Sequence, residues 1–345
     1  MVRLLCKVSI FCAAIFTFCM LTALAQEKKT PSVWFIGYPH MSCGFEMAVK
    51  LQKAGFNVNG MSHPGLEGPA LKWDDVKKYN VLIVMGIGKS NADFTLSEKN
   101  KTNIEILNKF LNEGGGIFYI PQWVQQNTLI PPQKAFLDPL GITPLFDDVP
   151  VDPENSVNAT SWKIDFAKTA NIAKTPLTEG VKNFWFPVNT RAGAQNHTTP
   201  FTTGTDWTIA VKGEKSCSTQ TIALDGIYSN KAMEGKIKSE VPIMAFRQVG
   251  KGRIICFGVT SEYLFNNVAS TTLEGIVMEK GLKKVPSDGY KLIENSLKWL
   301  AEPSLSETVL GGAPMNTALL ENPFKTKFGT PFVWDDKVKR LESSA

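Results

Sequence analysis

Three short apolar runs constrain the fold of this 345-residue chain more than any other feature. They are the strand-like start of Ser32–His40, the run VLIVM at Val81–Met85 and the run IFYI at Ile117–Ile120. Strands that are apolar on both faces belong to parallel sheets covered by helices. Helical patterns separate the runs, and this alternation predicts right-handed crossovers. We therefore predict an α/β fold with a doubly wound, mostly parallel sheet and helices on both faces.

Two helical patterns supply the crossovers. Residues 43–58 carry apolar side chains at helical spacing, reach Gly55 in the position of a helix C-cap, and lead into a strand that starts at Phe56. The next helix is announced by Thr95-x-x-Glu98, the pattern of a capping box. Its predicted buried stripe and its end are formed by Ile104, Leu107, Phe110, Leu111 and the glycines Gly114–Gly116.

From about residue 131 to 241 the pattern becomes irregular and β-rich. Pro131 and Pro132 begin a set of prolines that breaks the periodicity, and short aromatic and β-branched runs predict antiparallel strands. These runs are NFWFPV, WTIAVKG and TIALDGIY. A hairpin is predicted around Val249–Gly252, and the segment SDGYKLIENSLKWLAE, residues 287–302, is predicted to close the domain as a helix. We predict one α/β domain at 27–302, with this irregular insertion, and an extended tail or linker at 303–345.

The N-terminus has the order of regions found in a cleavable signal peptide. Arg3 and Lys7 precede a long apolar run, which ends in Ala-Leu-Ala at residues 23–25. We predict a signal peptide at 1–25, cleavage after Ala25, and a secreted or periplasmic protein that meets the membrane only transiently. An uncleaved anchor is the alternative, because the run approaches the roughly 20 residues that span a bilayer.

Composition and cysteine spacing restrict the possible functions. The net charge of +5 is spread thinly and basic runs are no longer than two residues, so we predict no nucleic-acid binding. Three of the six cysteines lie in the signal, and Cys43, Cys217 and Cys256 remain without metal-type spacing. In an oxidising compartment Cys217 could pair with Cys43 or Cys256. The apolar run RIICFGV instead predicts burial of Cys256.

Five segments, taken in order, resemble the class I glutamine amidotransferase-like superfamily. They are WDDVKKYNVLIVMG, LNKFLNEGGGIFYIP, TPLTEGVKNFWFP, VGKGRIICFGVTSEY and NSLKWLAE, within residues 31–302. The likeness is closest to the secreted or trehalose-utilisation-type branch. The family implies a flavodoxin-like α/β sandwich with added antiparallel strands in the C-terminal half.

The resemblance also implies that the catalytic triad is not retained. Glutaminases of this superfamily use a cysteine at a strained turn, with a His and a Glu after a late strand; the imidazole activates the thiol and the carboxylate orients the ring. Here the turn reads IPQW at residues 120–123, and the late position reads TSE at 260–262. Glu262 keeps the carboxylate, while the thiol and the imidazole are missing. We therefore expect no glutamine hydrolysis.

A replacement catalytic site would draw on residues after the first two strands. Cys43 lies near a helix N-terminus, which lowers the pKa of a thiol, and His40 is three residues away. Packing of Cys43 under the helix is the alternative, because no third group that orients the histidine is visible. His40 and His63 with Glu46 or Glu67 could bind a metal, but H-x-H and H-E-x-x-H spacings are absent. We predict no metal and no cofactor.

Candidate ligand-binding residues follow the strands at the carboxyl edge, where doubly wound sheets bind ligands. Gly86-x-Gly88 comes directly after an apolar strand, but phosphate-binding fingerprints need more glycines, so a tight turn is the alternative. Tryptophans on loops can stack on sugar rings, and core packing is the alternative. The candidates are Gly86, Gly88, Lys89, Ser90, His63, Gln122 and Trp123.

These observations favour an exported, non-catalytic amidotransferase-like domain. It would bind a small, carbohydrate-related ligand at the carboxyl edge, or a protein partner through the C-terminal tail. The first alternative is a sugar-processing hydrolase or isomerase that uses Glu262, His40 and His63 as acid–base groups. The second is a structural accessory module of a larger envelope assembly.

Overall fold

The computed structural model of the protein describes residues 30–36, 45–59, 69–121, 127–158, 165–188, 198–221, 233–259, 277, 280–306 and 309–317. The chain divides into two units, Met1–Thr30 and Pro31–Ala345, and all the helices and strands below belong to the second. The predicted signal peptide and cleavage point lie outside the described residues. Of the helices within those residues, none is both long and apolar enough to cross a bilayer.

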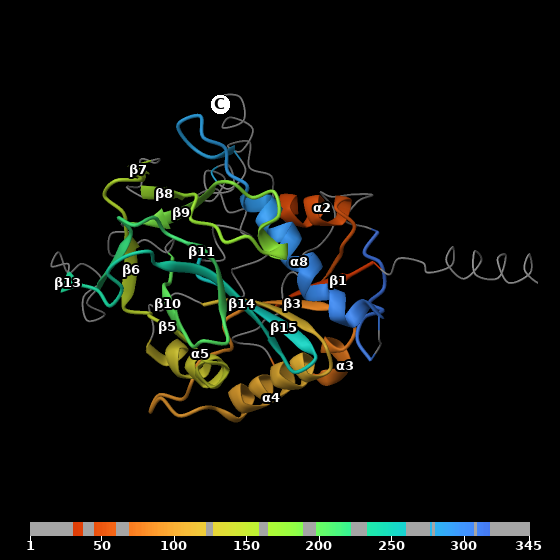
Figure 1. Ribbon diagram of the computed structural model, residues 1–345. Coiled ribbons are helices and arrows are strands. Elements are labelled where there is room, and N and C mark those ends of the chain that lie inside the picture. Colours follow the sequence, from red (N-terminus) through yellow and green to blue (C-terminus); the bar gives the residue numbers. More distant parts are fainter. Residues whose placement is uncertain are drawn as a thin grey trace, which may run out of the picture. The chain divides into compact units, whose positions relative to one another are not determined.

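A seven-stranded mixed sheet forms the core of this unit (Figure 1). Its order is β11-β14-β15-β4-β3-β1-β2: neighbouring strands from β15 to β2 pair in parallel, whereas β14 pairs antiparallel with both β15 and β11. The strands are β1 Ser32–Ile36, β2 Asn57–Asn59, β3 Val81–Met85, β4 Gly116–Ile120, β11 Thr208–Lys212, β14 Pro242–Val249 and β15 Gly252–Phe257. The parallel part, β2-β1-β3-β4-β15, has the flavodoxin-like order. The predicted fold class is confirmed.

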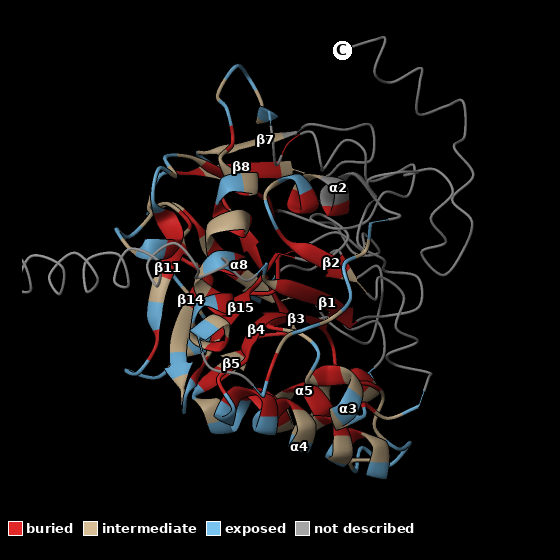
Figure 2. Cartoon of the chain, turned by 90° about the vertical axis from the view of Figure 1, so that its right-hand side faces the viewer, coloured by how far each residue is buried: buried red, intermediate tan, exposed pale blue. Residues whose placement is uncertain are grey.

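Helices cover both faces of the sheet (Figure 1). One face carries α2 (Phe45–Lys53) and α8 (Gly289–Ser306), and the other carries α3 (Trp73–Val76), α4 (Glu98–Asn112) and α5 (Ile130–Leu137). Because side chains alternate along a strand, Phe35 of β1 packs in the first core and Ile36 in the second. β1, β3 and β4 are buried along their whole length (Figure 2), which explains why their sequences show no polar alternation.

The three glycines between α4 and β4 meet different constraints. Gly114 has a φ of +94°, in the left-handed region that favours glycine. A Cβ on Gly115 would lie 2.3 Å from the Phe110 ring, and a Cβ on Gly116 would lie 2.4 Å from the carbonyl oxygen of Leu300 in α8. Helix α8 therefore approaches the backbone of β4 so closely that a side chain at residue 116 has no room.

The N-cap of α4 differs from the prediction. Ser97, not Thr95, caps the helix: the Ser97 hydroxyl accepts from the Asn100 backbone N–H at 3.2 Å, and Asn100 Oδ1 accepts from the Ser97 N–H at 3.1 Å. Asn100 takes the part that Glu or Gln plays in the usual capping box. Thr95 is occupied elsewhere, because its hydroxyl donates to Asp93 Oδ1 at 2.6 Å.

The first prolines of the irregular region start a helix rather than interrupt a pattern. Helix α5 begins at Ile130 and carries Pro131 and Pro132 in its first turn. A backbone N–H has no intrahelical partner there, so proline costs no helical hydrogen bond. Phe136 and Leu137 then bury the inner side of α5 against the sheet. The expectation that these prolines break regular structure was wrong at this point.

Short antiparallel sheets are present among the described residues between 138 and 241, as the sequence predicts, while residues 222–228 of the predicted strand TIALDGIY lie outside the described residues. The pairs form the sheets β10-β5, β13-β12-β6 and β7-β8-β9, and β11 joins the main sheet. Trp185, Phe186 and Trp207 are buried, so they pack in the core. The bounds are β5 Ile142–Pro144, β6 Asp148–Val151, β7 Ser156–Asn158, β8 Asp165–Thr169, β9 Phe184–Val188, β10 Phe201–Thr203, β12 Ser218–Thr221 and β13 Met233–Glu234, with 3-10 turns η1 Asn127–Leu129, η2 Asp138–Leu140 and η3 Pro176–Thr178.

The C-terminal part contains more ordered structure than the sequence indicates. The predicted hairpin is present, with Val249 of β14 paired to Gly252 of β15. Helix α8 continues past residue 302 to Ser306 and includes Pro303. Residues 309–317, which we call the strap, then run beside the start of β2 and the turn before β3.

Candidate functional site

The topological switch point of the parallel sheet lies between β1 and β3. The chain leaves β1 for β2 on one side and continues with β3 on the other, and ligands of such sheets bind at the carboxyl ends of the strands beside this point. The described part of that edge is mainly the segment after β3, residues 86–97. The candidates after the other strands, which lie outside the described residues and whose roles stay predictions, are His40, Cys43, His63, Gln122, Trp123 and Glu262.

Two glycines turn the chain at the end of β3. Gly86 has a φ of +78° and Gly88 a φ of +124°, and both residues are buried. Ile87 between them is also buried and packs in the core beneath α4. The left-handed backbone agrees with the interpretation of a tight turn, since only glycine adopts such angles without strain.

Asn103 of α4 holds this turn from below, and sequence reasoning missed it. Its Nδ2 donates to the Ile87 carbonyl at 3.2 Å, and its Oδ1 accepts from the Leu71 N–H at 2.8 Å. A buried amide with both ends paired ties the segment before α3 and the turn after β3 to one helix. The available signal was a polar residue at position 103, one helical turn before Leu107 in the apolar stripe.

Lys89 and Ser90 emerge from the turn into partial exposure. The Ser90 N–H donates to the Thr128 carbonyl of η1 at 2.8 Å, so this segment is joined to the element that precedes α5. The Ser90 hydroxyl donates to the Asn91 carbonyl at 3.0 Å. Its oxygen keeps the capacity to accept a hydrogen bond from a ligand.

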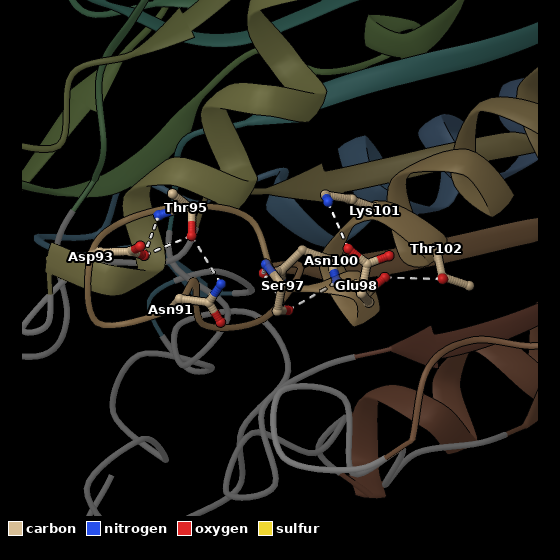
Figure 3. A network of polar contacts seen from close by, with 8 residues as sticks. All are labelled: Asn91, Asp93, Thr95, Ser97, Glu98, Asn100, Lys101 and Thr102. Atoms are coloured by element: carbon tan, nitrogen blue, oxygen red, sulfur yellow. Dashed lines mark hydrogen bonds and ion pairs between the residues drawn. The ribbon is translucent and has the colours of Figure 1, made fainter.

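Residues 91–95 form a hydrogen-bonded turn between Ser90 and the α4 cap (Figure 3). The Asn91 N–H donates to the Thr95 carbonyl at 2.9 Å, and Asn91 Nδ2 donates to the Thr95 hydroxyl at 2.9 Å. Asp93 Oδ1 accepts from the hydroxyl and the N–H of Thr95 at 2.6 and 3.0 Å. These bonds, the hydroxyl first, lower the pKa of Asp93, so the carboxylate is ionised at neutral pH. Phe94 projects from this turn and is 53% exposed.

The thiols in the described part of the chain are unsuited to nucleophilic chemistry. Cys217 and Cys256 are both free and buried, so they do not pair with each other. Burial, together with the nearby Asp152 carboxylate, raises the pKa of Cys217 to about 12, and burial raises the pKa of Cys256 still further. A reactive cysteine needs the opposite shift. The prediction that Cys256 is buried as a small hydrophobe is confirmed.

The end of β15 is backed by the segment before β10. The Thr199 N–H donates to the Gly258 carbonyl at 2.8 Å, and a Cβ on Gly258 would lie 2.4 Å from the Thr199 carbonyl oxygen. Thr198 and Val259 form an isolated antiparallel bridge beside this contact. The hydroxyl of Thr199 is buried and has no hydrogen-bond partner among the described residues. Across all the residues that the structure describes, no group of three His, Cys, Asp or Glu residues is arranged to hold a metal ion.

Comparison with known proteins gives similarity of structure only. No family model matches the chain, and no curated protein matches it. Among solved structures, a ThuA-like protein from Parabacteroides merdae is 10% identical with a TM-score of 0.42, and the match covers 81% of this chain and 93% of that one. A glutamine amidotransferase from Thermotoga maritima is 9% identical with a TM-score of 0.39, covering 79% and 99%.

A third solved structure, the mmIFT52 N-terminal domain, is 10% identical with a TM-score of 0.49, covering 78% of this chain and 97% of that one. At such identities neither a substrate nor a partner can be transferred to this chain. The flavodoxin-like assignment therefore stands on the strand order and the pairing of the sheet itself.

Proposed function

We propose that the protein is an exported, non-catalytic domain that binds a small, carbohydrate-related ligand at the carboxyl edge of its parallel sheet. The observation that carries the proposal is the switch point between β1 and β3, where two left-handed glycines and the partly exposed Lys89 and Ser90 follow β3. An ammonium group and a hydroxyl are groups that bind the oxygens of a polyhydroxylated ligand.

Glutamine hydrolysis has no support from the residues of this chain. β4 ends at Ile120, and the sequence that follows it is Pro121, Gln122 and Trp123, which offers no thiol. The position of the late histidine holds Thr260. Acyl transfer from glutamine needs a nucleophile and a base at one place. We propose that this edge of the sheet has kept a ligand-binding geometry without that chemistry.

Thermal unfolding of the exported chain tests the proposal. N-terminal sequencing of the secreted product fixes the start of the protein, which we expect at Gln26. Trehalose, maltose, cellobiose, nucleotides and divalent metals are then screened for a rise in Tm. A ligand that binds only the native state at about 100 times its Kd adds ~2.7 kcal/mol of stability. We expect a sugar to raise Tm and metals to have no effect.

Matched variants locate the bound sugar. Lys89→Ala and Ser90→Ala should reduce the shift, while Lys298→Ala on the exposed side of α8 should leave it unchanged. A shift that survives both substitutions at residues 89 and 90 places the ligand elsewhere. Sugar turnover abolished by Glu262→Gln would instead support a hydrolase or isomerase, and ammonia release from glutamine would contradict the loss of the amidotransferase reaction.

A further inference from the structure

Phe94 is an unusual residue at the described part of the carboxyl edge. Four large hydrophobic side chains are exposed among the described residues, and Phe94 is the aromatic one. The other three are Met233 on β13 and Val309 and Met315 on the strap. Among the described residues, Phe94 is thus the one large exposed hydrophobic residue of the segment between β3 and α4.

The backbone at Phe94 adopts an angle that phenylalanine disfavours. Its φ is +67°, in the left-handed region, where a Cβ crowds the neighbouring carbonyl oxygen. Glycine or asparagine would adopt this angle at lower cost. An exposed aromatic side chain in a strained conformation contributes little to the folded core, so its presence points to a use for the ring.

Several hydrogen bonds hold the turn that carries Phe94 (Figure 3). The Phe94 N–H donates to the Asn91 carbonyl at 3.0 Å, and Thr95 is bonded to both Asn91 and Asp93. Ser90 on one side is joined to η1, and Ser97 on the other side caps α4. The ring is therefore presented from a preorganised backbone, which lowers the entropy that binding would cost.

The surroundings of Phe94 are polar on both sides along the chain. Asn91, Asp93 and Thr95 are all exposed, and Asp93 is ionised. A flat apolar ring beside carboxylate and amide groups matches a molecule with one apolar face and a rim of hydroxyls. A pyranose has this character, because its C–H face packs on an aromatic ring while its hydroxyls bond to planar polar groups.

We propose that Phe94 is the stacking platform for a pyranose ring, with Asn91 and Asp93 as groups that bind its hydroxyls. This inference rests on the proposed function, because it assumes that the carboxyl edge binds a sugar. It adds the residue that selects a carbohydrate over other polar ligands.

Backbone-matched variants test the platform. Phe94→Gly removes the ring and the strain together, and Lys283→Gly changes another exposed residue with left-handed φ, +51°, far along the chain. Both variants should unfold at a Tm equal to or above that of the wild type. Affinity for trehalose, maltose and cellobiose is measured by isothermal titration calorimetry. We expect Phe94→Gly to weaken sugar binding about tenfold or more, and Phe94→Trp and Lys283→Gly to preserve it.

Each outcome decides one point. Sugar binding by Phe94→Gly at wild-type affinity would overturn the platform and leave the proposed function standing. A wild-type protein that binds none of these disaccharides would contradict the proposed function and the platform with it. A lower Tm for Phe94→Gly alone would assign the ring a structural role and also overturn the inference.

Discussion

At the scale of single residues, Cys256 and Tyr119 lie side by side in the parallel pair of β15 and β4, and both are completely buried. The Tyr119 hydroxyl donates to Gln133 Oε1 of α5 at 3.2 Å, so the polar end of the ring is satisfied. Burial raises the pKa of both groups. Residues that ionise in other active sites therefore serve here as neutral core.

These raised values predict a loss of stability at alkaline pH. The thiols of Cys217 and Cys256 stay protonated in the folded chain at pH values where they ionise in the unfolded chain, near pH 9. Unfolding then releases protons, so stability present below pH 9 falls as pH rises toward 12, by ~1.4 kcal/mol per pH unit for each thiol. Denaturant titrations at pH 10 to 11, above the pKa of the unfolded thiols and below that of the folded ones, measure this slope.

Cys217→Ala provides the control for that measurement. In this variant the free energy of unfolding should fall less steeply with pH, by the contribution of one thiol, whatever the effect of the substitution on stability at neutral pH. An unchanged slope would mean that Cys217 ionises in the folded protein.

At the scale of elements, α8 is positioned by its close approach to the backbone of β4. The Arg253 side chain strengthens the same contact from β15, because its Nη1 donates to the Trp299 carbonyl and to Glu302, both at 2.6 Å. The Arg253 guanidinium also lies 4.7 Å from the centre of the Trp299 ring. The position of α8 thus depends on Gly116 in β4, which leaves room for the helix, and on Arg253 in β15, which binds it.

Gly116→Ala should disrupt this packing. The added Cβ would meet the backbone of Leu300 at 2.4 Å, and backbone atoms cannot rotate away as a side chain can. We expect a loss of about 2–3 kcal/mol in the free energy of unfolding, measured in urea. Gly204→Ala is the matched control, since its Cβ would have its nearest neighbour at 3.5 Å, and it should change stability by less than about 0.5 kcal/mol.

At the scale of the molecule, the strap connects the C-terminal part of the described chain to its beginning. The Gly311 N–H donates to the Lys77 carbonyl at 2.9 Å, and Asn57 Nδ2 donates to the Ala313 carbonyl at 3.0 Å. Gln52 of α2 donates to the Asn316 carbonyl at 2.8 Å. The strap therefore joins α2, β2 and the turn before β3, which are separated from it by more than 230 residues.

Substitution of the neighbouring residues Leu310 and Val309 tests whether the strap stabilises the fold. Leu310 is 4% exposed and packs in the core beneath α4, while Val309 is 58% exposed. Leu310→Ala should cost about 2–3 kcal/mol of unfolding free energy, and Val309→Ala about 0.5 kcal/mol or less. A Leu310→Ala effect as small as that of Val309→Ala in urea unfolding would show that burial of Leu310 does not stabilise the folded chain.

The sequence by itself determined the elements whose signals are local. The runs at β1, β3 and β4 are apolar on both faces because both faces are covered, and this pattern predicted the parallel sheet. The hairpin of β14 and β15 and the turn at Gly86–Gly88 were predictable because glycine marks the backbone angles that they need. In the candidate site, the turn at Gly86–Gly88 is the feature that the sequence predicted and that lies within the described residues.

Only the tertiary structure decided features whose partners lie far along the chain or compete locally. Ser97 caps α4 because Thr95 bonds to Asp93 instead, a choice that spacing alone does not resolve. Asn103 occupies a buried helix face because Leu71 and Ile87 supply its hydrogen bonds. The strap is held because the carbonyls of Lys77 and Lys78 accept its backbone N–H groups and because Leu310 is buried in the core. The cap, the buried amide and the strap each depend on contacts that form only in the folded chain, and no periodicity in the sequence predicts those contacts.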